Sequence, residues 1–272
     1  MLTIIWRYKL AMANYTGDYY MSETLILLIP FIGTALGAAM SLFFRRGLSL
    51  RAEKVFLGFA AGVMTAAAIW SLLIPALDAA ESCLPVVSGF LVGVGFLLLL
   101  DMIIPHLHLE SESPEGLPVK LPRRTMLLLA VTLHNIPEGM AVGVALAGAL
   151  SESAISTSSA LVLSMGIALQ NFPEGAVVSM PLLGEGMSRK KAFFCGVLSG
   201  AVEPVAALAT LFFTRELSSV LPFLLSFAAG AMLYVVAEEL IPESQAGKHS
   251  NTGTVSAAFG FAVMMVLDIV FG

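Results

Sequence analysis

The amino-acid sequence predicts an all-α membrane protein built from eight transmembrane helices. Of its 272 residues, 58% are hydrophobic and 12% are charged, and the mean hydropathy is +0.90, whereas soluble domains carry about 25% charged residues. Apolar runs of about 20 residues, the length that crosses a bilayer, recur along the whole chain, and Lys and Arg fall in alternate connections between them. These features exclude a soluble domain, and we expect a lipid bilayer rather than nucleic acid as a partner.

The apolar runs place the helices in order at residues 22–44, 55–77, 86–105, 125–149, 157–182, 191–213, 219–241 and 253–271. Gly, Ala and Ser are frequent within them, which favours close helix packing in lipid and is compatible with a homodimer. We expect residues 1–21 to form an extracytoplasmic tail, with Met1 and Met21 as alternative start residues. Residues 22–272 are predicted to form a single transmembrane transport domain.

Basic residues predict the orientation of these helices. The first, third, fifth and seventh connections contain 11 of the 14 Lys and Arg residues, namely Arg45, Arg46, Arg51, Lys54, Lys120, Arg123, Arg124, Arg189, Lys190, Lys191 and Lys248. Because cytoplasmic loops are enriched in Lys and Arg, both termini are expected outside the cytoplasm. Cys83 and Cys195 then lie near opposite membrane faces, too far apart for a disulfide.

The connection at residues 105–123 is the longest, and we expect it in the cytoplasm. It contains His106, His108, Glu110 and Glu112. Two interpretations remain open for this segment. Either these side chains bind a metal transiently, or they belong to a solvated polar loop, which the prolines and charges favour.

A polar block is repeated inside two of the apolar runs. LHNIPEG at Leu133 to Gly139 returns as LQNFPEG at Leu169 to Gly175. On a helix, side chains four residues apart share a face, as His134 and Glu138 do in the first block and Gln170 and Glu174 in the second. Each proline leaves the carbonyl four residues earlier without its helical hydrogen bond. Two such helices bring together the side chains of His134, Asn135, Glu138, Gln170, Asn171 and Glu174.

Three acids are predicted near the middle of the membrane. They are Glu138, Glu174 and Glu203, and each would cost about 2.5–3.5 kcal/mol if it were charged and unpaired there. With no Lys or Arg inside the helix cores, protons, water or a bound cation must compensate. The imidazole of His134 beside carboxylates favours a transition metal over Mg or Ca. A polar network that only fixes helix packing explains the repeated block poorly.

Further acids follow in order along the same path. Asp78 and Asp268 are expected at the outer face, and Asp101, Glu238 and Glu239 at the inner face. Each one alone is typical of a solvated helix end. Their order, with the central acids between them, describes a path for cations.

The two repeated blocks resemble signatures of the ZIP (Zrt/Irt-like) divalent metal transporters, in particular the bacterial GufA-like branch. The resemblance covers residues 22–272 and implies an inverted repeat, with helices 1–3 related to 6–8 around helices 4 and 5. It also implies a bacterial inner membrane and a binuclear metal site. The first position would contain His134, Glu138, Gln170, Glu174 and Met64, although one Met in a helix is by itself more typical of core packing. The second would contain Asn135, Asn171 and Glu203 together with Glu138 and Glu174. Asp78 and Asp268 would line the entrance, and Asp101, Glu238 and Glu239 the exit.

Two positions differ from the pattern of many relatives. Glu238 stands where many have His, which makes the exit more acidic, and Asn171 stands where some have Asp. The second metal position therefore has one fewer potential charge, and a transit role and a regulatory role both remain open for it.

We therefore expect an importer of divalent transition metals, with zinc the first candidate and Cd, Fe, Mn and Co as others, that works by alternating access. A metal-sensing or channel-like membrane protein is the alternative. An intramembrane metal enzyme is disfavoured because His134 does not begin an HExxH motif, and ATP-driven pumping because the chain contains no P-loop.

Overall fold

The computed structural model describes residues 23–44, 47–107, 116–119, 121–151, 155–184, 186–215, 220–248 and 250–272. The secondary-structure elements within these ranges are all helices. Eight helical segments are long and apolar enough to cross a membrane, namely Glu23–Phe43, Leu50–Ala79, Cys83–Ile103, Arg123–Leu150, Thr157–Gly184, Arg189–Thr214, Leu221–Gln245 and Thr252–Phe271. The predicted fold class is confirmed. The tail at residues 1–21 lies outside the described residues.

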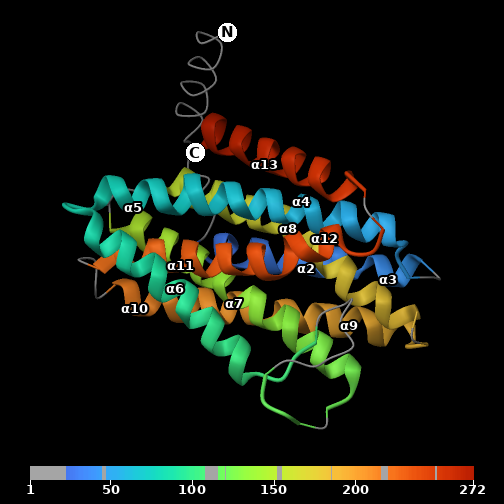
Figure 1. Ribbon diagram of the computed structural model, residues 1–272. Coiled ribbons are helices and arrows are strands. Elements are labelled where there is room, and N and C mark those ends of the chain that lie inside the picture. The colour runs from blue at the N-terminus through green and yellow to red at the C-terminus, as the bar shows by residue number, and fades with distance from the viewer. Residues whose placement is uncertain are drawn as a thin grey trace.

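Several spans consist of more than one helical element. The elements in order are α2 (Glu23–Ala38), α3 (Met40–Phe43), α4 (Leu50–Ala67), η1 (Ala68–Leu73), α5 (Ile74–Ala79), α6 (Cys83–Ile103), α7 (Arg123–Leu150), α8 (Thr157–Gly184), α9 (Arg189–Gly200), α10 (Val202–Arg215), α11 (Leu221–Val235), η3 (Val236–Leu240), α12 (Ile241–Gln245) and α13 (Thr252–Phe271). Most of them run along one common direction, and α13 lies against α4 on the outside of the bundle (Figure 1).

The second and seventh spans contain the same irregularity. Each passes through a π-helical segment, η1 or η3, that ends directly before an Ile-Pro pair, Ile74-Pro75 or Ile241-Pro242. Proline has no N–H to donate to the carbonyl four residues earlier, and a wider π turn is one way for a helix to accommodate this. Such turns frequently mark functional sites.

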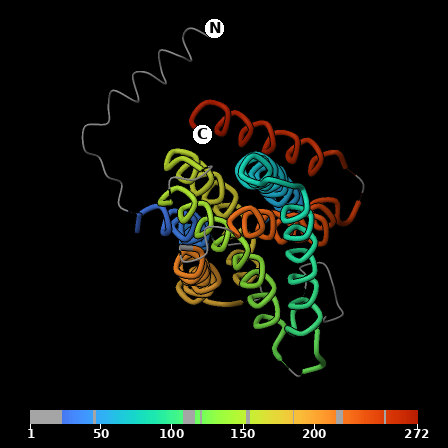
Figure 2. Tube along the Cα trace, turned by 90° about the vertical axis from the view of Figure 1, so that its left-hand side faces the viewer, coloured from blue at the N-terminus to red at the C-terminus, as the bar shows by residue number. Residues whose placement is uncertain are grey.

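The helix pairings follow an inverted repeat. The four most extensive pairings among the described elements are α4 with α13, α6 with α11, α2 with α8, and α7 with α10. The inverted repeat exchanges spans 1–3 with spans 6–8, and span 4 with span 5. Under this exchange the pair α4 and α13 becomes α11 and α6, and the pair α2 and α8 becomes α10 and α7. The end-on trace in Figure 2 shows α2, α8 and α10 on one side of the bundle and α6 along the other, with α7 crossing between them.

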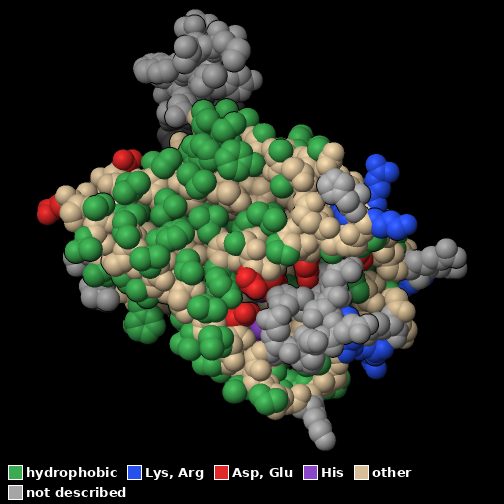
Figure 3. All heavy atoms as spheres, viewed as in Figure 1, with side chains coloured by type: hydrophobic (Ala, Val, Ile, Leu, Met, Phe, Trp, Pro, Cys, Tyr) green, Lys and Arg blue, Asp and Glu red, His purple; other side chains and the backbone are tan. Residues whose placement is uncertain are grey.

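The two ends of the bundle differ in charge. In Figure 3 the Lys and Arg side chains gather at one end and carboxylates lie at the opposite extremity. The end where α4, α7 and α9 begin is called the basic end below, and the end at the α5–α6 connection, which carries Asp78 and Glu81, the acidic end. Cys83 lies at the start of α6 and Cys195 on α9, and both are free thiols, as predicted.

Candidate metal site

Both copies of the repeated block lie inside uninterrupted helices at the centre of the bundle. α7 continues through Pro137 and α8 through Pro173. All six polar side chains of the two blocks are buried: His134, Asn135, Glu138, Gln170, Asn171 and Glu174. The face predicted from the helical spacing is therefore the face that the bundle encloses.

Glu203 reaches the same region through a break in the sixth span. A single helix was expected at residues 191–213, but α9 ends at Gly200 and α10 begins at Val202. Pro204 contributes to this break, because it cannot donate to the carbonyl of Gly200. Glu203 consequently lies in the first turn of α10, where the helix dipole stabilises a negative charge, and it is buried.

The two helices of the repeat are joined by a short hydrogen bond. Gln170 Nε2 on α8 donates to Glu138 Oε1 on α7 over 2.6 Å. The side chain of Asn171 lies beside the carboxyl groups of both Glu138 and Glu203. Glu138 is also close enough to Glu174 and Glu203 for the carboxyl groups to repel each other when they are charged. A cation between them would relieve this repulsion.

Among the residues that the structure describes, seven buried polar atoms at this site have no hydrogen-bond partner. They are Asn135 Oδ1, Glu138 Oε2, Gln170 Oε1, Glu174 Oε1, Glu203 Oε2 and both Nδ2 and Oδ1 of Asn171. Buried polar groups are nearly always paired, so a cluster of unpaired ones requires an explanation. Six of the seven are oxygen atoms, which are donors for a divalent cation. The side chains therefore fit the ion that the sequence predicts.

His134 makes a different contact from the one expected. It was grouped with Glu138, Gln170 and Glu174, but its Nε2 lies 2.8 Å from Glu239 Oε1 on η3. In the described part of the chain, no three His, Cys, Asp or Glu side chains are grouped closely enough to hold one ion together. The donors are thus divided between a buried group around Glu138 and a second group around His134. Met64 is fully buried in the core of α4.

A cavity leads from the second group to the basic end. It encloses about 600 Å³ including its mouth, and its lining contains His134, Glu174, Glu239 and Glu243 among mostly apolar side chains. Figure 3 shows carboxylates and a histidine at the surface near the middle of the viewed face. An ion at Glu174 would therefore have access to the basic end, whereas Glu138 is fully buried.

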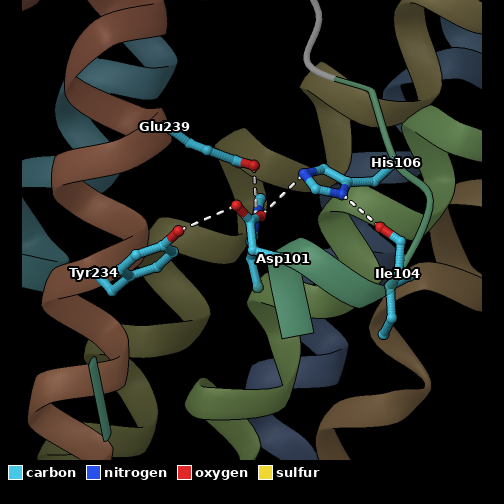
Figure 4. A network of polar contacts seen from close by, with 6 residues as sticks. Asp101, Ile104, His106, Tyr234 and Glu239 are labelled. Carbon is cyan, nitrogen blue, oxygen red and sulfur yellow. Dashed lines mark hydrogen bonds and ion pairs between the residues drawn. The ribbon is translucent and has the colours of Figure 1, made fainter. Parts of the chain in front are cut away.

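Asp101 lies beside this path in a network of polar contacts (Figure 4). Tyr234 donates its hydroxyl hydrogen to Asp101 Oδ2 over 3.1 Å, and His106 Nε2 lies 3.0 Å from Asp101 Oδ1. Glu239 is close enough to interact with the same carboxyl group. The predicted exit residues Asp101 and Glu239 are thus neighbours, but Glu238 is exposed and does not line the cavity.

His106 differs from the solvated-loop interpretation of the long connection, whereas residues 116–119 of the same connection are exposed as that interpretation predicts. The side chain of His106 is fully buried, and Nδ1 lies 2.8 Å from the carbonyl oxygen of Ile104. Partners on both ring nitrogens explain why a polar side chain is buried here. His108, Glu110 and Glu112 lie outside the described residues.

The predicted entrance residues lie near the acidic end. Ser71 Oγ on η1 donates to Asp268 Oδ1 over 2.8 Å, and Asp78 is exposed at the end of α5. Sequence reasoning missed Ser71, Tyr234 and Thr34, because single hydroxyl groups in apolar helices are usually local packing groups.

Comparison with known proteins identifies the family. The family model described as ZIP Zinc transporter matches residues 110–268, which is more than half of the chain. The chain belongs to the ZIP zinc transporter family. Zinc transporter ZIP11 of Homo sapiens is 36% identical and the alignment covers 88% of this chain and 94% of the relative. Zinc transporter ZIPB of Bordetella bronchiseptica is 38% identical, with 89% and 79% covered. Zinc transporter GufA of Myxococcus xanthus is 37% identical, with 88% and 96% covered.

These similarities bear on several predictions. Membership of the ZIP family and the likeness to GufA are confirmed. The family consists of transporters, so the prediction that the protein is not an enzyme is also confirmed. Together with the eight apolar spans, the family establishes an integral membrane protein.

Proposed function

We propose that this protein imports zinc and related divalent ions through a binuclear site at the centre of the bundle. The observation that carries the proposal is the cluster of unpaired buried oxygen atoms around Glu138, Glu174 and Glu203. Among the described residues, the buried Lys54 contacts Lys248 and Ser250 and not these acids. A cargo cation would neutralise the acids instead. The family and its zinc-transporting relatives support the same conclusion.

The two ion positions share two carboxylates. His134, Glu138, Gln170 and Glu174 would hold the first ion, with Met64 adding a thioether. Asn135, Asn171 and Glu203, again with Glu138 and Glu174, would hold the second. An ion in the first position would replace the hydrogen bond between Gln170 and Glu138, because both side chains would bind the ion. Forming the first position requires His134 to leave Glu239.

Alternating access would arise from movement between two groups of helices. α4, α6, α11 and α13 pair among themselves, and so do α2, α7, α8 and α10. The contact of His134 with Glu239 joins α7 of one group to η3 of the other. The cavity opens toward the basic end, whereas the donors nearer the acidic end are fully buried. This difference supports a mechanism in which the two ends open in turn. The arrangement described is open toward the basic end.

Release would follow the carboxylates that line the cavity. An ion that leaves Glu174 and His134 would meet Glu239 next, beside Asp101, and then Glu243 at the next turn of the same span. Each step exchanges one set of oxygen donors for another, so no single site holds the ion too tightly to release it. Asp78 and Asp268 would collect cations at the acidic end.

Orientation and context complete the proposal. By the positive-inside rule the basic end would face the cytoplasm, with both termini outside. The resemblance to bacterial relatives suggests an inner membrane as the host. Residues 22–272 would then be one transport domain, with the connection 105–123 in the cytoplasm, and α6 and α13 expose apolar faces that suit lipid or a second copy of the chain. Cd, Fe, Mn and Co are further candidate cargoes, since the same donor set accepts them.

Uptake by proteoliposomes tests the proposal. Wild-type protein should take up Zn²⁺ and Cd²⁺ with saturable kinetics, and Glu138→Ala should abolish uptake while the protein still elutes as a monodisperse species. Glu23→Ala is the matched control, because Glu23 is an exposed acid at the start of α2. Unchanged uptake in Glu138→Ala would exclude the proposed site. Uptake that never saturates would favour a channel, and metal binding without uptake a sensor.

A further inference from the structure

A hydroxyl group on α2 contacts the second metal position. Thr34 is buried on α2, and its Oγ1 donates a hydrogen bond of 2.6 Å to Oε1 of Glu203 on α10. Hydroxyl groups approach carboxylates to about 2.5–2.7 Å when the acceptor is charged. The contact joins two residues 169 positions apart, so sequence patterns give no sign of it.

The distances indicate that Glu203 accepts the hydrogen bond of Thr34. The other acceptor near Thr34 Oγ1 is the carbonyl oxygen of Pro30, at 3.4 Å, and a hydroxyl group has one hydrogen to donate. The second carboxylate oxygen, Glu203 Oε2, is buried without a partner. Thr34 therefore occupies one oxygen of Glu203 and leaves the other available.

The backbone beside this contact restricts how Glu203 can turn. A Cβ atom added to Gly200 would lie 2.8 Å from Thr34 Cβ and 3.0 Å from Glu203 Oε1. Such distances are too short for real contacts, so the two side chains already fill the space next to α9. Glu203 is thus held between the hydroxyl group of Thr34 and the backbone at Gly200.

We propose that Thr34 is a positioning residue that makes Glu203 a one-oxygen ligand for the ion in the second position. This inference rests on the proposed function, because it assumes that Glu203 binds the cargo. A carboxylate that offers one oxygen suits Zn²⁺, which prefers few ligands, whereas larger ions accept two oxygens from one carboxylate. Without the hydroxyl group Glu203 would be free to bind with both oxygens, and the larger Cd²⁺ would gain relative to Zn²⁺.

Metal titration of the purified full-length protein tests this role. We expect Thr34→Val to weaken Zn²⁺ binding at the second position about tenfold, the effect of losing one hydrogen bond to a charged group. The ratio of Zn²⁺ to Cd²⁺ affinity should fall, and Thr34→Ser should restore both values. A role in packing alone would give the opposite pattern, since Val keeps the shape of Thr and Ser does not.

Ser164→Ala provides the matched control. Ser164 is also buried, and its Oγ donates over 2.6 Å to the carbonyl oxygen of Ile26 on the same helix α2. We expect its loss to leave both metal affinities at the wild-type values, because no carboxylate is involved. If Ser164→Ala changes the Zn²⁺ to Cd²⁺ ratio as Thr34→Val does, the proposed role of Thr34 is wrong.

A double-mutant cycle keeps the inference testable if Thr34→Val folds poorly. Thr34→Ala is then compared with wild type and again in a Glu203→Gln background. Because the hydroxyl group acts through Glu203, removing it in the Glu203→Gln background should not change metal binding further. Additive effects would overturn the inference. Wild-type protein that neither binds nor transports metal would instead overturn the proposed function, whereas normal binding by both Thr34 variants would overturn this inference alone.

Discussion

The two copies of the repeated block have nearly the same sequence and opposite surroundings. α7 runs from the basic end to the acidic end and α8 runs back, so His134 and Glu174 face the basic end while Glu138 and Gln170 face the acidic end. His134 and Glu174 line the cavity. Glu138 and Gln170 are fully buried and contact each other. Access to each donor is therefore set by the packing at the two ends, and not by the block itself.

Removal of charge from either copy should have the largest effect. Glu138→Gln and Glu174→Gln should each reduce Zn²⁺ uptake by more than the roughly 100-fold that follows loss of an outer-sphere partner, since both acids are shared between the two positions. Initial uptake rates in proteoliposomes measure this. A large loss in one variant with normal uptake in the other would show that the two copies are not equivalent.

Thiol labelling should distinguish the open side from the sealed side. Val178 lines the cavity, and Val142, its counterpart 36 positions earlier, is fully buried in the core. In a background with Cys83 and Cys195 replaced by Ser, Val178→Cys should react with a small charged methanethiosulfonate much faster than Val142→Cys. Equal rates would contradict the proposed difference in access.

The contact between His134 and Glu239 should matter more than the neighbouring acid. Glu239→Gln removes the charge that faces His134, and we expect uptake to fall about tenfold, the lower end of the range for groups that orient a metal ligand. Glu238→Gln should cause a smaller loss, since Glu238 is exposed and does not line the cavity. The reverse order would place the exit on the other face of η3.

Overpacking either copy with a Gly→Ala substitution should lower the stability of the protein by a similar amount. Compared with the variants above, these should affect transport least. A Cβ on Gly139 would meet the carbonyl oxygen of Glu203, and one on Gly175 the carbonyl oxygen of Thr34. Gly139→Ala and Gly175→Ala should each destabilise the protein by about 1–3 kcal/mol, as overpacking does, and lower its melting temperature. Gly184→Ala is the control, because nothing lies within 4 Å of its added Cβ. A normal melting temperature in one of the first two variants would show that the copies are packed differently.

The amino-acid sequence by itself determined the spans, the alternation of charge and the side chains of the repeated block. These are local properties, because a membrane helix satisfies its own backbone hydrogen bonds and needs only enough apolar length. The helical spacing likewise determined that His134, Asn135 and Glu138 share one buried face. The π-helical segments η1 and η3 were not predicted, although each precedes an Ile-Pro pair that could have indicated a break.

The tertiary structure alone decided which donors meet. Thr34 contacts Glu203 and His134 contacts Glu239 over separations that no periodicity reports, and His106 is buried against Asp101 just after the end of α6. The contact of His134 with Glu239 depends on how one group of helices lies against the other, which differs between open and closed arrangements of the same chain. The residue types of the metal site are therefore a property of the sequence, and their division into a sealed group and an accessible group is a property of the fold.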